Sequence, residues 1–207
     1  MTQPPSSPGI GRDADARWLT ELVRSARQGD DLAFNRLIDL HHEAIYKMIF
    51  YRIKDAMDAE DLSQEVFLQA CRNIGRLRQA ANFRAWLFRI AVNRVKDYRR
   101  RKRWSFIRGL FRTEDLSGQD GRLAVQAPEG PERVRRQQFW QEVDRLLEPL
   151  SPAEQEAFRL RFFDQLSIKE IGQVLDKPEN TVKTHLYRAL RKVKASPFLD
   201  RLAEAAP

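Results

Sequence analysis

Apolar residues recur three or four positions apart along most of this 207-residue chain, which is the spacing that places them on one face of an α-helix. Runs of β-branched residues, which would indicate strands, are scarce. We therefore expect an all-α protein. In chain order, the predicted helices cover residues 16–28, 30–54, 58–75, 81–103, 132–148, 152–163, 167–175 and 179–195.

One internal segment breaks this pattern. Gly, Ser, Asp, Gln and Pro punctuate residues 105–131, and no helical period persists there, which is typical of a linker. The chain is therefore expected to form two small helical domains, residues 18–104 and 132–196, joined by a flexible linker. Residues 1–17 are predicted to be a disordered tail, and residues 197–207 a second tail.

The C-terminal domain contains the spacing of a helix-turn-helix unit. A short helix from Ile168 to Leu175 precedes a turn at 176–178, and a longer helix follows. Apolar side chains of the longer helix are expected to face a core: Val182, Leu186, Leu190 and Val193. In such units the second helix enters the major groove of DNA, and its first half faces the base edges.

The other side of this longer helix is polar and strongly basic. Its first half offers side chains that suit base edges, since Arg bonds guanine and Thr or Tyr can meet a thymine methyl group. These side chains are Lys183, Thr184, Tyr187 and Arg188. Cations further along suit phosphates, namely Arg191, Lys192 and Lys194. The alternative is a solvated basic face on a plain helical hairpin.

A second basic stripe lies within residues 82–104, on a predicted helix whose apolar face is expected to consist of Leu87, Ile90, Ala91, Val95 and Tyr98. It carries an aromatic ring, an amide and three cations at helical spacing: Trp86, Arg89, Asn93, Lys96 and Arg100. Aromatic rings stack on unpaired bases and cations follow the phosphates, so the stripe suits single-stranded nucleic acid. The alternative is a core tryptophan on a solvated basic helix.

An acidic stripe lies within residues 58–70. One face of this predicted helix should pack in a core: Leu62, Val66, Phe67 and Ala70. The other face carries Asp61, Gln64, Glu65 and Leu68. An acidic stripe with a leucine, inside a basic protein, indicates a protein partner rather than DNA. The alternative is that these charges only keep the helix soluble.

The charge balance favours a polyanionic partner. Lys and Arg number 37 against 29 Asp and Glu, a net charge of +8, which points first to nucleic acid and second to an acidic membrane surface. The basic helices carry few large apolar residues for a membrane surface. No apolar run approaches the roughly 20 residues of a membrane helix, so no membrane insertion is expected. The single cysteine, Cys71, excludes an intrachain disulfide, fits the cytoplasm and is expected to be buried.

Catalysis is not expected. His41 and His42 are adjacent and would point to different faces of a helix, which is a poor metal site, and His185 lies far along the chain. The sequence has no P-loop, no nucleophile elbow and no paired His-Glu spacing. We therefore predict no enzyme activity, no metal and no cofactor.

Three segments, in this order, resemble the sigma factors of the extracytoplasmic-function (ECF) group, which are small bacterial promoter-specificity subunits. "DAEDLSQEVFLQA" resembles their region 2.2, and "NFRAWLFRIAVNRVKDYRRRKR" resembles regions 2.3 and 2.4. "LSPAEQEAFRLRFFDQLSIKEIGQVLDKPENTVKTHLYRALRKVK" resembles region 4. The resemblance covers about residues 20–104 and 132–195.

The resemblance implies an alternative sigma factor that binds core RNA polymerase and directs it to specific promoters. Region 2 would melt the −10 element, and region 4 would bind the −35 element as duplex. The expected partners are the β′ clamp and β subunit of the polymerase, promoter DNA and a cognate anti-sigma factor.

The resemblance also assigns residues. Contacts to the β′ clamp would come from Asp61, Gln64, Glu65 and Leu68. Contacts to the −10 element would come from the 76–83 loop and the helix after it: Arg76, Arg78, Asn82, Phe83, Trp86, Arg89, Asn93, Lys96 and Arg100. Contacts to the −35 element would come from Lys183, Thr184, His185, Tyr187, Arg188, Arg191 and Lys192. The loop "RLRQAANF" lacks the Gly-Asp-type turn of the family.

The alternative function is that of a stand-alone helix-turn-helix regulator that binds an operator. It would use residues 166–195 in the same way. It gives no role to the acidic stripe or to the basic stripe within 82–104.

Overall fold

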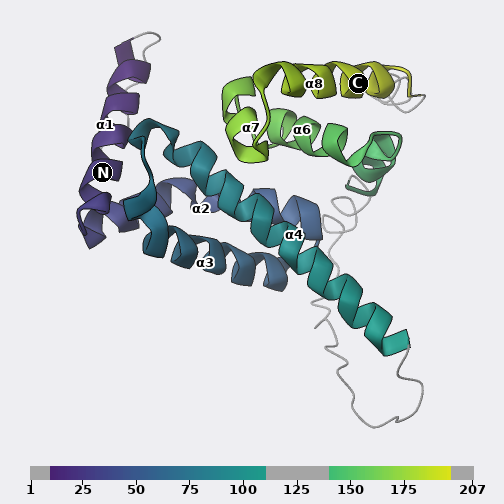
Figure 1. Ribbon diagram of the computed structural model, residues 1–207, viewed down its shortest axis with the longest axis horizontal. Coiled ribbons are helices and arrows are strands. Elements are labelled where there is room, and N and C mark those ends of the chain that lie inside the picture. Colours follow the sequence, from purple (N-terminus) through teal and green to yellow (C-terminus); the bar gives the residue numbers. More distant parts are fainter. Residues whose placement is uncertain (1–9, 111–139, 197–207) are drawn as a thin grey trace, which may run out of the picture. The chain divides into compact units, whose positions relative to one another are not determined.

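The computed structural model describes residues 10–110 and 140–196, which form helices joined by turns (Figure 1). Within these two ranges there is no β-strand, so the all-α prediction is confirmed. Most of the predicted linker lies outside the described residues.

The contacts divide the chain into two compact units. Among the described residues, 10–97 and 166–177 form the first unit, and 98–110, 140–165 and 178–196 form the second. The domain boundaries expected from the sequence stay a prediction.

Three helices build the N-terminal part of the first unit. They are α1 (Ile10–Arg27), α2 (Asp31–Ile53) and α3 (Ala56–Asn73). Helix α2 packs against both α1 and α3 (Figure 1). Aspartates cap two of these helices: Asp30 Oδ1 accepts the N–H of Ala33 at 3.1 Å, and Asp55 Oδ1 accepts that of Asp58 at 2.9 Å. The carboxylates satisfy backbone donors that the helix itself leaves unpaired.

Two short 3₁₀ turns lead from α3 into the longest helix. They are η1 (Ile74–Arg76) and η2 (Ala80–Asn82), and α4 follows at Phe83–Leu110. Helix α4 continues past the predicted end at 103 and into the predicted linker, because residues 104–108 contain no proline or glycine to stop it.

The core of the first unit is apolar and closely follows the predicted helix faces. On α3 the predicted face is buried, at Leu62, Val66, Phe67 and Ala70. On α4 the buried residues include Leu87, Ile90, Ala91 and Val95. Helix α2 adds large side chains with no exposure: Leu37, Ile45, Met48 and Ile49. Burial of these side chains is the main favourable contribution to folding of this unit.

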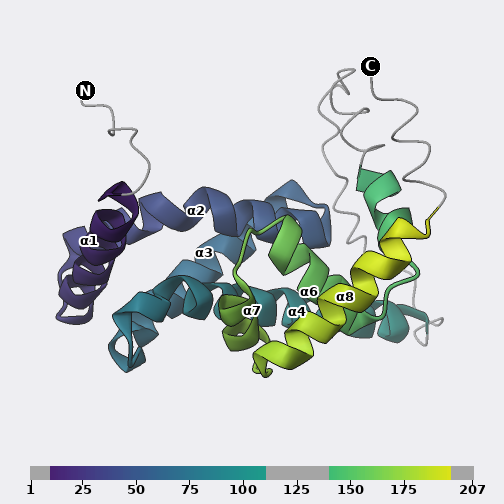
Figure 2. The ribbon, with the colours of Figure 1, turned by 90° about the horizontal axis from the view of Figure 1, so that it is seen from above.

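The second unit is built from the helical residues 140–147 and two longer helices. Helix α6 (Pro152–Phe162) packs against α8 (Glu179–Lys194), and the two lie side by side in Figures 1 and 2. They share a core of Val143, Leu147, Leu150, Phe158, Ala189 and Val193, with Trp140, Leu146 and Phe163 packed against it. This core holds α8 by one face.

Two helices begin at a serine N-cap. Ser151 caps α6 in a capping box with Glu154, and Ser167 caps α7 (Ile168–Leu175) in a second one with Glu170. Helix α7 ends at Asp176, whose φ of 55° is left-handed, and α8 begins directly after Pro178. The short helix, turn and longer helix therefore follow one another as the sequence predicted.

Four details differ from the prediction. Leu190 is 37% exposed, and Ala189, at 0%, takes its place in the core. Cys71 is exposed rather than buried, because it lies on the face of α3 opposite the buried stripe. Helix α1 begins at Ile10, inside the predicted tail of 1–17, and Tyr98 is only half-buried at the end of the apolar face of α4.

Candidate nucleic-acid interface

Helix α8 presents a polar face whose orientation follows from its buried face. Val182, Leu186, Ala189 and Val193 are at most 7% exposed, with spacings of four, three and four residues that place them on one side of the helix. The side chains predicted to contact the −35 element lie on the remaining surface. Exposed among them are Lys183, Thr184, Tyr187, Arg188 and Arg191, whereas His185 and Lys192 are partly buried.

Two of these exposed side chains suit contact with DNA in particular ways. Tyr187 is 70% exposed, which is unusual for a large aromatic ring and favours a contact made only with a partner. Thr184 Oγ1 donates a hydrogen bond to the carbonyl of Asn180 at 2.9 Å. The bond occupies the hydroxyl proton and leaves the methyl group as the apolar contact that a thymine methyl would meet.

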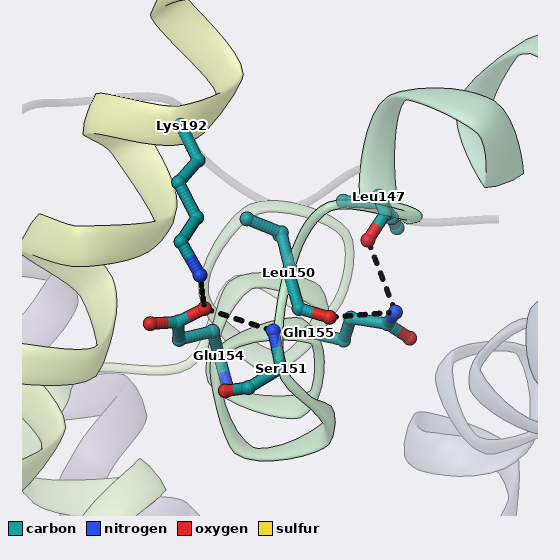
Figure 3. Close-up of polar contacts among 6 residues, drawn as sticks. All are labelled: Leu147, Leu150, Ser151, Glu154, Gln155 and Lys192. Atoms are coloured by element: carbon teal, nitrogen blue, oxygen red, sulfur yellow. Dashed lines mark hydrogen bonds and ion pairs between the residues drawn. The ribbon is translucent and has the colours of Figure 1, made fainter.

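Lys192 lies differently from the other predicted contacts of α8. Its Nζ donates a hydrogen bond to Oε2 of Glu154 on α6 at 2.7 Å (Figure 3). Glu154 is 4% exposed. The predicted phosphate contact of Lys192 therefore competes with an ion pair inside the second unit.

The basic stripe of α4 is an exposed row over a buried aromatic layer. Arg89, Asn93, Lys96 and Arg100 are exposed, and Trp86 is partly buried. The ring of Trp86 packs against Phe83, with centroids 5.8 Å apart, and Phe83 in turn packs edge-on against His41 at 5.3 Å. This packing fixes the tryptophan beside the cations, which is what a stacking surface for an unpaired base requires.

The loop before α4 presents two cations above an apolar base. Arg76 and Arg78 are exposed, while the intervening Leu77 is 6% exposed and anchors the loop in the core. Asn82 donates from Nδ2 to Oε1 of Gln79 at 2.9 Å, which braces the second 3₁₀ turn.

Phe83 requires a correction. The sequence placed it among the −10 contacts, but it is 1% exposed. Its position at the first residue of α4, beneath Trp86, makes it part of the core that supports the stripe. The sequence signal was misread because an aromatic residue next to a basic helix suits both stacking on a base and packing in a core.

The acidic stripe of α3 is exposed as the spacing predicted. Asp61, Gln64 and Leu68 are exposed, with Leu68 at 57%, and Glu65 is partly exposed. Arg94 of α4 joins this helix: its Nε donates to Gln69 Oε1 at 2.8 Å, and its guanidinium lies 3.6 Å from Glu65. The sequence analysis missed Arg94 as a bridge, because such a contact between two helices has no local signal.

Comparison with known proteins identifies both halves of the chain. The model of Sigma-70 region 2 matches residues 37–105, and that of Sigma-70 region 4 matches residues 140–193. The ECF RNA polymerase sigma-E factor of Escherichia coli (strain K12) is 30% identical over 185 residues, which is 87% of this chain and 95% of the relative. The chain belongs to the ECF RNA polymerase sigma factors.

Further relatives agree with this family. The RNA polymerase sigma-H factor of Pseudomonas aeruginosa is 31% identical over 82% of this chain and 88% of its own length. The ECF RNA polymerase sigma factor BldN of Streptomyces coelicolor is 36% identical over 86% of this chain, and the alignment spans 66% of BldN. This sigma factor is thus an alternative sigma factor that directs RNA polymerase to promoters, and it is not an enzyme.

Two solved structures share the fold of this sigma factor. CnrH, in complex with the cytosolic domain of CnrY, gives a TM-score of 0.64 at 22% identity, covering 88% of this chain and 97% of CnrH. The sigma factor RpoE of Bartonella quintana, in complex with the anti-sigma factor NepR, gives 0.56 at 21% identity, covering 81% and 96%.

Two features of the described residues bear on other functions. Across residues 10–110 and 140–196, every helix of the sigma factor is too short or too polar to span a bilayer. In the same part of the chain, no three His, Cys, Asp or Glu side chains gather where a metal ion could bind. His41 is buried and His42 pairs with Glu60 at 3.6 Å on the surface, so the two neighbours point to different surroundings.

Proposed function

We propose that this sigma factor divides promoter recognition between two helices. Helix α8 binds the −35 element as duplex through its exposed basic face, and α4 with the 76–83 loop captures and opens the −10 element. One observation carries the proposal: α4 and α8 each have one buried apolar face and one exposed polar face. The two helices lie largely within the matched region 2 and region 4, respectively.

The chemistry of each face fits its element. Arg188 bonds a guanine through two parallel hydrogen bonds in a major groove, and Thr184 offers a methyl group to thymine. On α4, the fixed Trp86 ring stacks on an extruded base, while cations follow the single strand. Melting costs about 1.4 kcal/mol per base-pair step, and stacking returns about 1–3 kcal/mol per base, so part of the cost is offset by this surface.

The acidic stripe of α3 supplies the contact to core polymerase in this proposal. Its members are Asp61, Gln64, Glu65 and Leu68, and their partner is the β′ clamp. An exposed leucine among carboxylates gives an apolar anchor with a charged rim, the usual anatomy of a protein interface. Further contacts go to the β subunit.

We also assign to this sigma factor an anti-sigma partner and a place in the cytoplasm. RpoE of Bartonella quintana was solved with the anti-sigma factor NepR, which supports the first assignment by analogy of fold. Residues 18–104 and 132–196 act as the two functional domains, and residues 105–131 join them.

Run-off transcription tests the proposal. Core bacterial polymerase is assayed with and without the full chain on templates randomised at the −10 and −35 elements. Transcripts that depend on the chain and share two short motifs are expected. Sequence-specific duplex binding by the chain alone, without transcripts, would support the operator-binding regulator instead.

The substitution Arg188→Ala sharpens this test. It should reduce discrimination at one −35 base by about 1–3 kcal/mol, which is the value of one bidentate base contact. Arg36→Ala removes the same charge from an exposed position of α2, in the other unit, and should leave discrimination unchanged. Equal effects of the two variants would show that Arg188 contributes only charge.

A further inference from the structure

Glu154 is a buried carboxylate that links the start of α6 to the end of α8. Its side chain is 6% exposed, and its Oε2 accepts a hydrogen bond from Lys192 Nζ at 2.7 Å (Figure 3). Lys192 belongs to the last turn of α8, and its side chain is 37% exposed. A charge-assisted bond to a buried carboxylate is stronger and more directional than a surface ion pair.

The same carboxylate oxygen also closes the capping box of α6. Oε2 accepts the backbone N–H of Ser151 at 2.8 Å, and Ser151 Oγ accepts the N–H of Glu154 at 3.3 Å. Contacts at the start of α6 therefore hold the Glu154 side chain in place independently of Lys192. It is a fixed anchor point, not a flexible surface group.

The residue after Glu154 contacts a third helical segment. Gln155 Nε2 donates to the carbonyls of Leu147 and Leu150, at 3.0 and 3.2 Å (Figure 3). These carbonyls lie at the end of the helical residues 140–147 and in the turn after them. The N-terminus of α6 thus ties together the helical segment before it and, through Glu154, the C-terminal turn of α8.

The geometry matters because the buried face of α8 is apolar. Val182, Leu186, Ala189 and Val193 bury one face, and burial of this kind has no preferred direction. A hydrogen-bonded ion pair fixes direction, so it limits rotation and sliding of α8 against α6. Arg188 lies one turn before Lys192 on the same rigid helix, and its guanidinium moves with any rotation of that turn.

We propose that Glu154 and Lys192 form a positioning pair, which sets how α8 presents its DNA-reading side chains, and that Lys192 itself binds no phosphate. The proposal rests on the proposed binding of α8 to the −35 element. It assigns to Glu154, an acidic residue within a DNA-binding unit, a role in promoter recognition, and it removes Lys192 from the predicted −35 contacts.

The substitution Glu154→Gln gives opposite predictions for the two readings of Lys192. Removing a carboxylate and releasing a lysine adds positive charge near the DNA, so a phosphate-binding Lys192 predicts equal or tighter binding. A positioning pair predicts weaker recognition instead. Gln remains compatible with a capping box, so the variant is expected to fold.

The measurement uses holoenzyme assembled from core polymerase and the full chain. Fluorescence anisotropy gives its dissociation constants for a promoter duplex and for the same duplex with a scrambled −35 element, over a series of salt concentrations. Glu154→Gln and Lys192→Met should each reduce the ratio of the two constants by about five- to tenfold, near the lower end for loss of one good base contact. Thermal unfolding shows that each variant is folded at the assay temperature.

Two further variants separate positioning from charge. Lys192→Arg keeps the charge and the donor, and should restore most of the discrimination. Lys194→Met removes a neighbouring exposed cation of α8, and should weaken both duplexes alike and lower the salt slope by about 1, as loss of one phosphate contact does. Lys192→Met should leave the slope unchanged.

The outcomes separate this proposal from the one on which it rests. Unchanged or tighter binding by Glu154→Gln, with a lower salt slope for Lys192→Met, would overturn the positioning pair and restore Lys192 as a phosphate contact. Unchanged discrimination for Arg188→Ala as well would show that α8 does not read the −35 element at all.

Discussion

At the scale of single residues, His41 has the most unusual surroundings of the three histidines. It is 8% exposed, its Nδ1 lies 3.0 Å from the carbonyl of Leu37, and its ring meets the edge of Phe83. Burial lowers the pKa of His41 below its ordinary 6.5; the bond to Leu37 opposes this shift, and the charge of Arg84 adds to it. At pH values between the folded pKa and 6.5, the imidazole is therefore neutral in the folded protein and charged in the unfolded chain.

This difference predicts a loss of stability in mild acid. Because the folded pKa is the lower one, the contribution of His41 is complete above pH 6.5 and is lost as pH falls from there through the folded pKa. One proton accounts for at most about 1.4 kcal/mol per pH unit. Urea denaturation between pH 5 and 8 should give a flatter profile for His41→Gln than for the native chain.

His42→Gln is the matched control, since the neighbouring ring is 42% exposed and paired with Glu60. The profile of His41→Gln should be flatter than that of His42→Gln. A His41→Gln profile as steep as that of the native chain would mean that other groups cause the loss in acid.

At the scale of whole elements, the sequence predicted the helices well, but it did not predict which of two neighbouring residues on a helix is buried. The faces of α3 and α4 followed from the 3.6-residue period, because their large apolar residues leave little choice. On α8 the period alone left two candidates, Ala189 and Leu190, since both lie one turn after Leu186. The larger residue was chosen, but the core with Phe158 takes the smaller one.

The two leucines of α8 test this arrangement. Leu186 is 7% exposed and Leu190 is 37% exposed. Leu186→Ala should lower the free energy of unfolding by about 2–5 kcal/mol, the range for a buried leucine, and Leu190→Ala by about 1 kcal/mol or less. Urea denaturation compares them directly, and equal losses would return Leu190 to the core, as the sequence first indicated.

Contacts between elements were the part that the sequence could not supply. The Lys192–Glu154 pair joins residues 38 apart, and Arg94 reaches Gln69 across 25. No local spacing signals such a pair, because the partners meet only after the helices have packed. The sequence therefore predicted Lys192 as a DNA contact and assigned no contact to Arg94, whereas the structure shows both as bridges between helices.

At the scale of the whole molecule, the proposed surfaces for polymerase binding and for −35 recognition can be tested separately. The exposed stripe of α3 and the exposed face of α8 lie on different helices. Their separation predicts that variants of one surface change one step alone. Arg188→Ala should therefore assemble holoenzyme normally and fail only at the −35 element.

Leu68 provides the reciprocal variant. It is 57% exposed at the C-terminal end of the acidic stripe, so its side chain contributes little to the core. Leu68→Ala should weaken binding to core polymerase by about 5- to 30-fold, the effect of an interface residue worth about 1–2 kcal/mol, without loss of thermal stability. Leu32→Ala on α2 removes an equally large side chain that is 74% exposed, and should change neither the binding to core polymerase nor the thermal stability. Competition against a labelled sigma factor for core polymerase measures the binding of both variants. At saturating concentrations of the Leu68→Ala variant, transcription should return to the native level. A deficit in transcription that persists at saturation would place Leu68 in promoter opening instead.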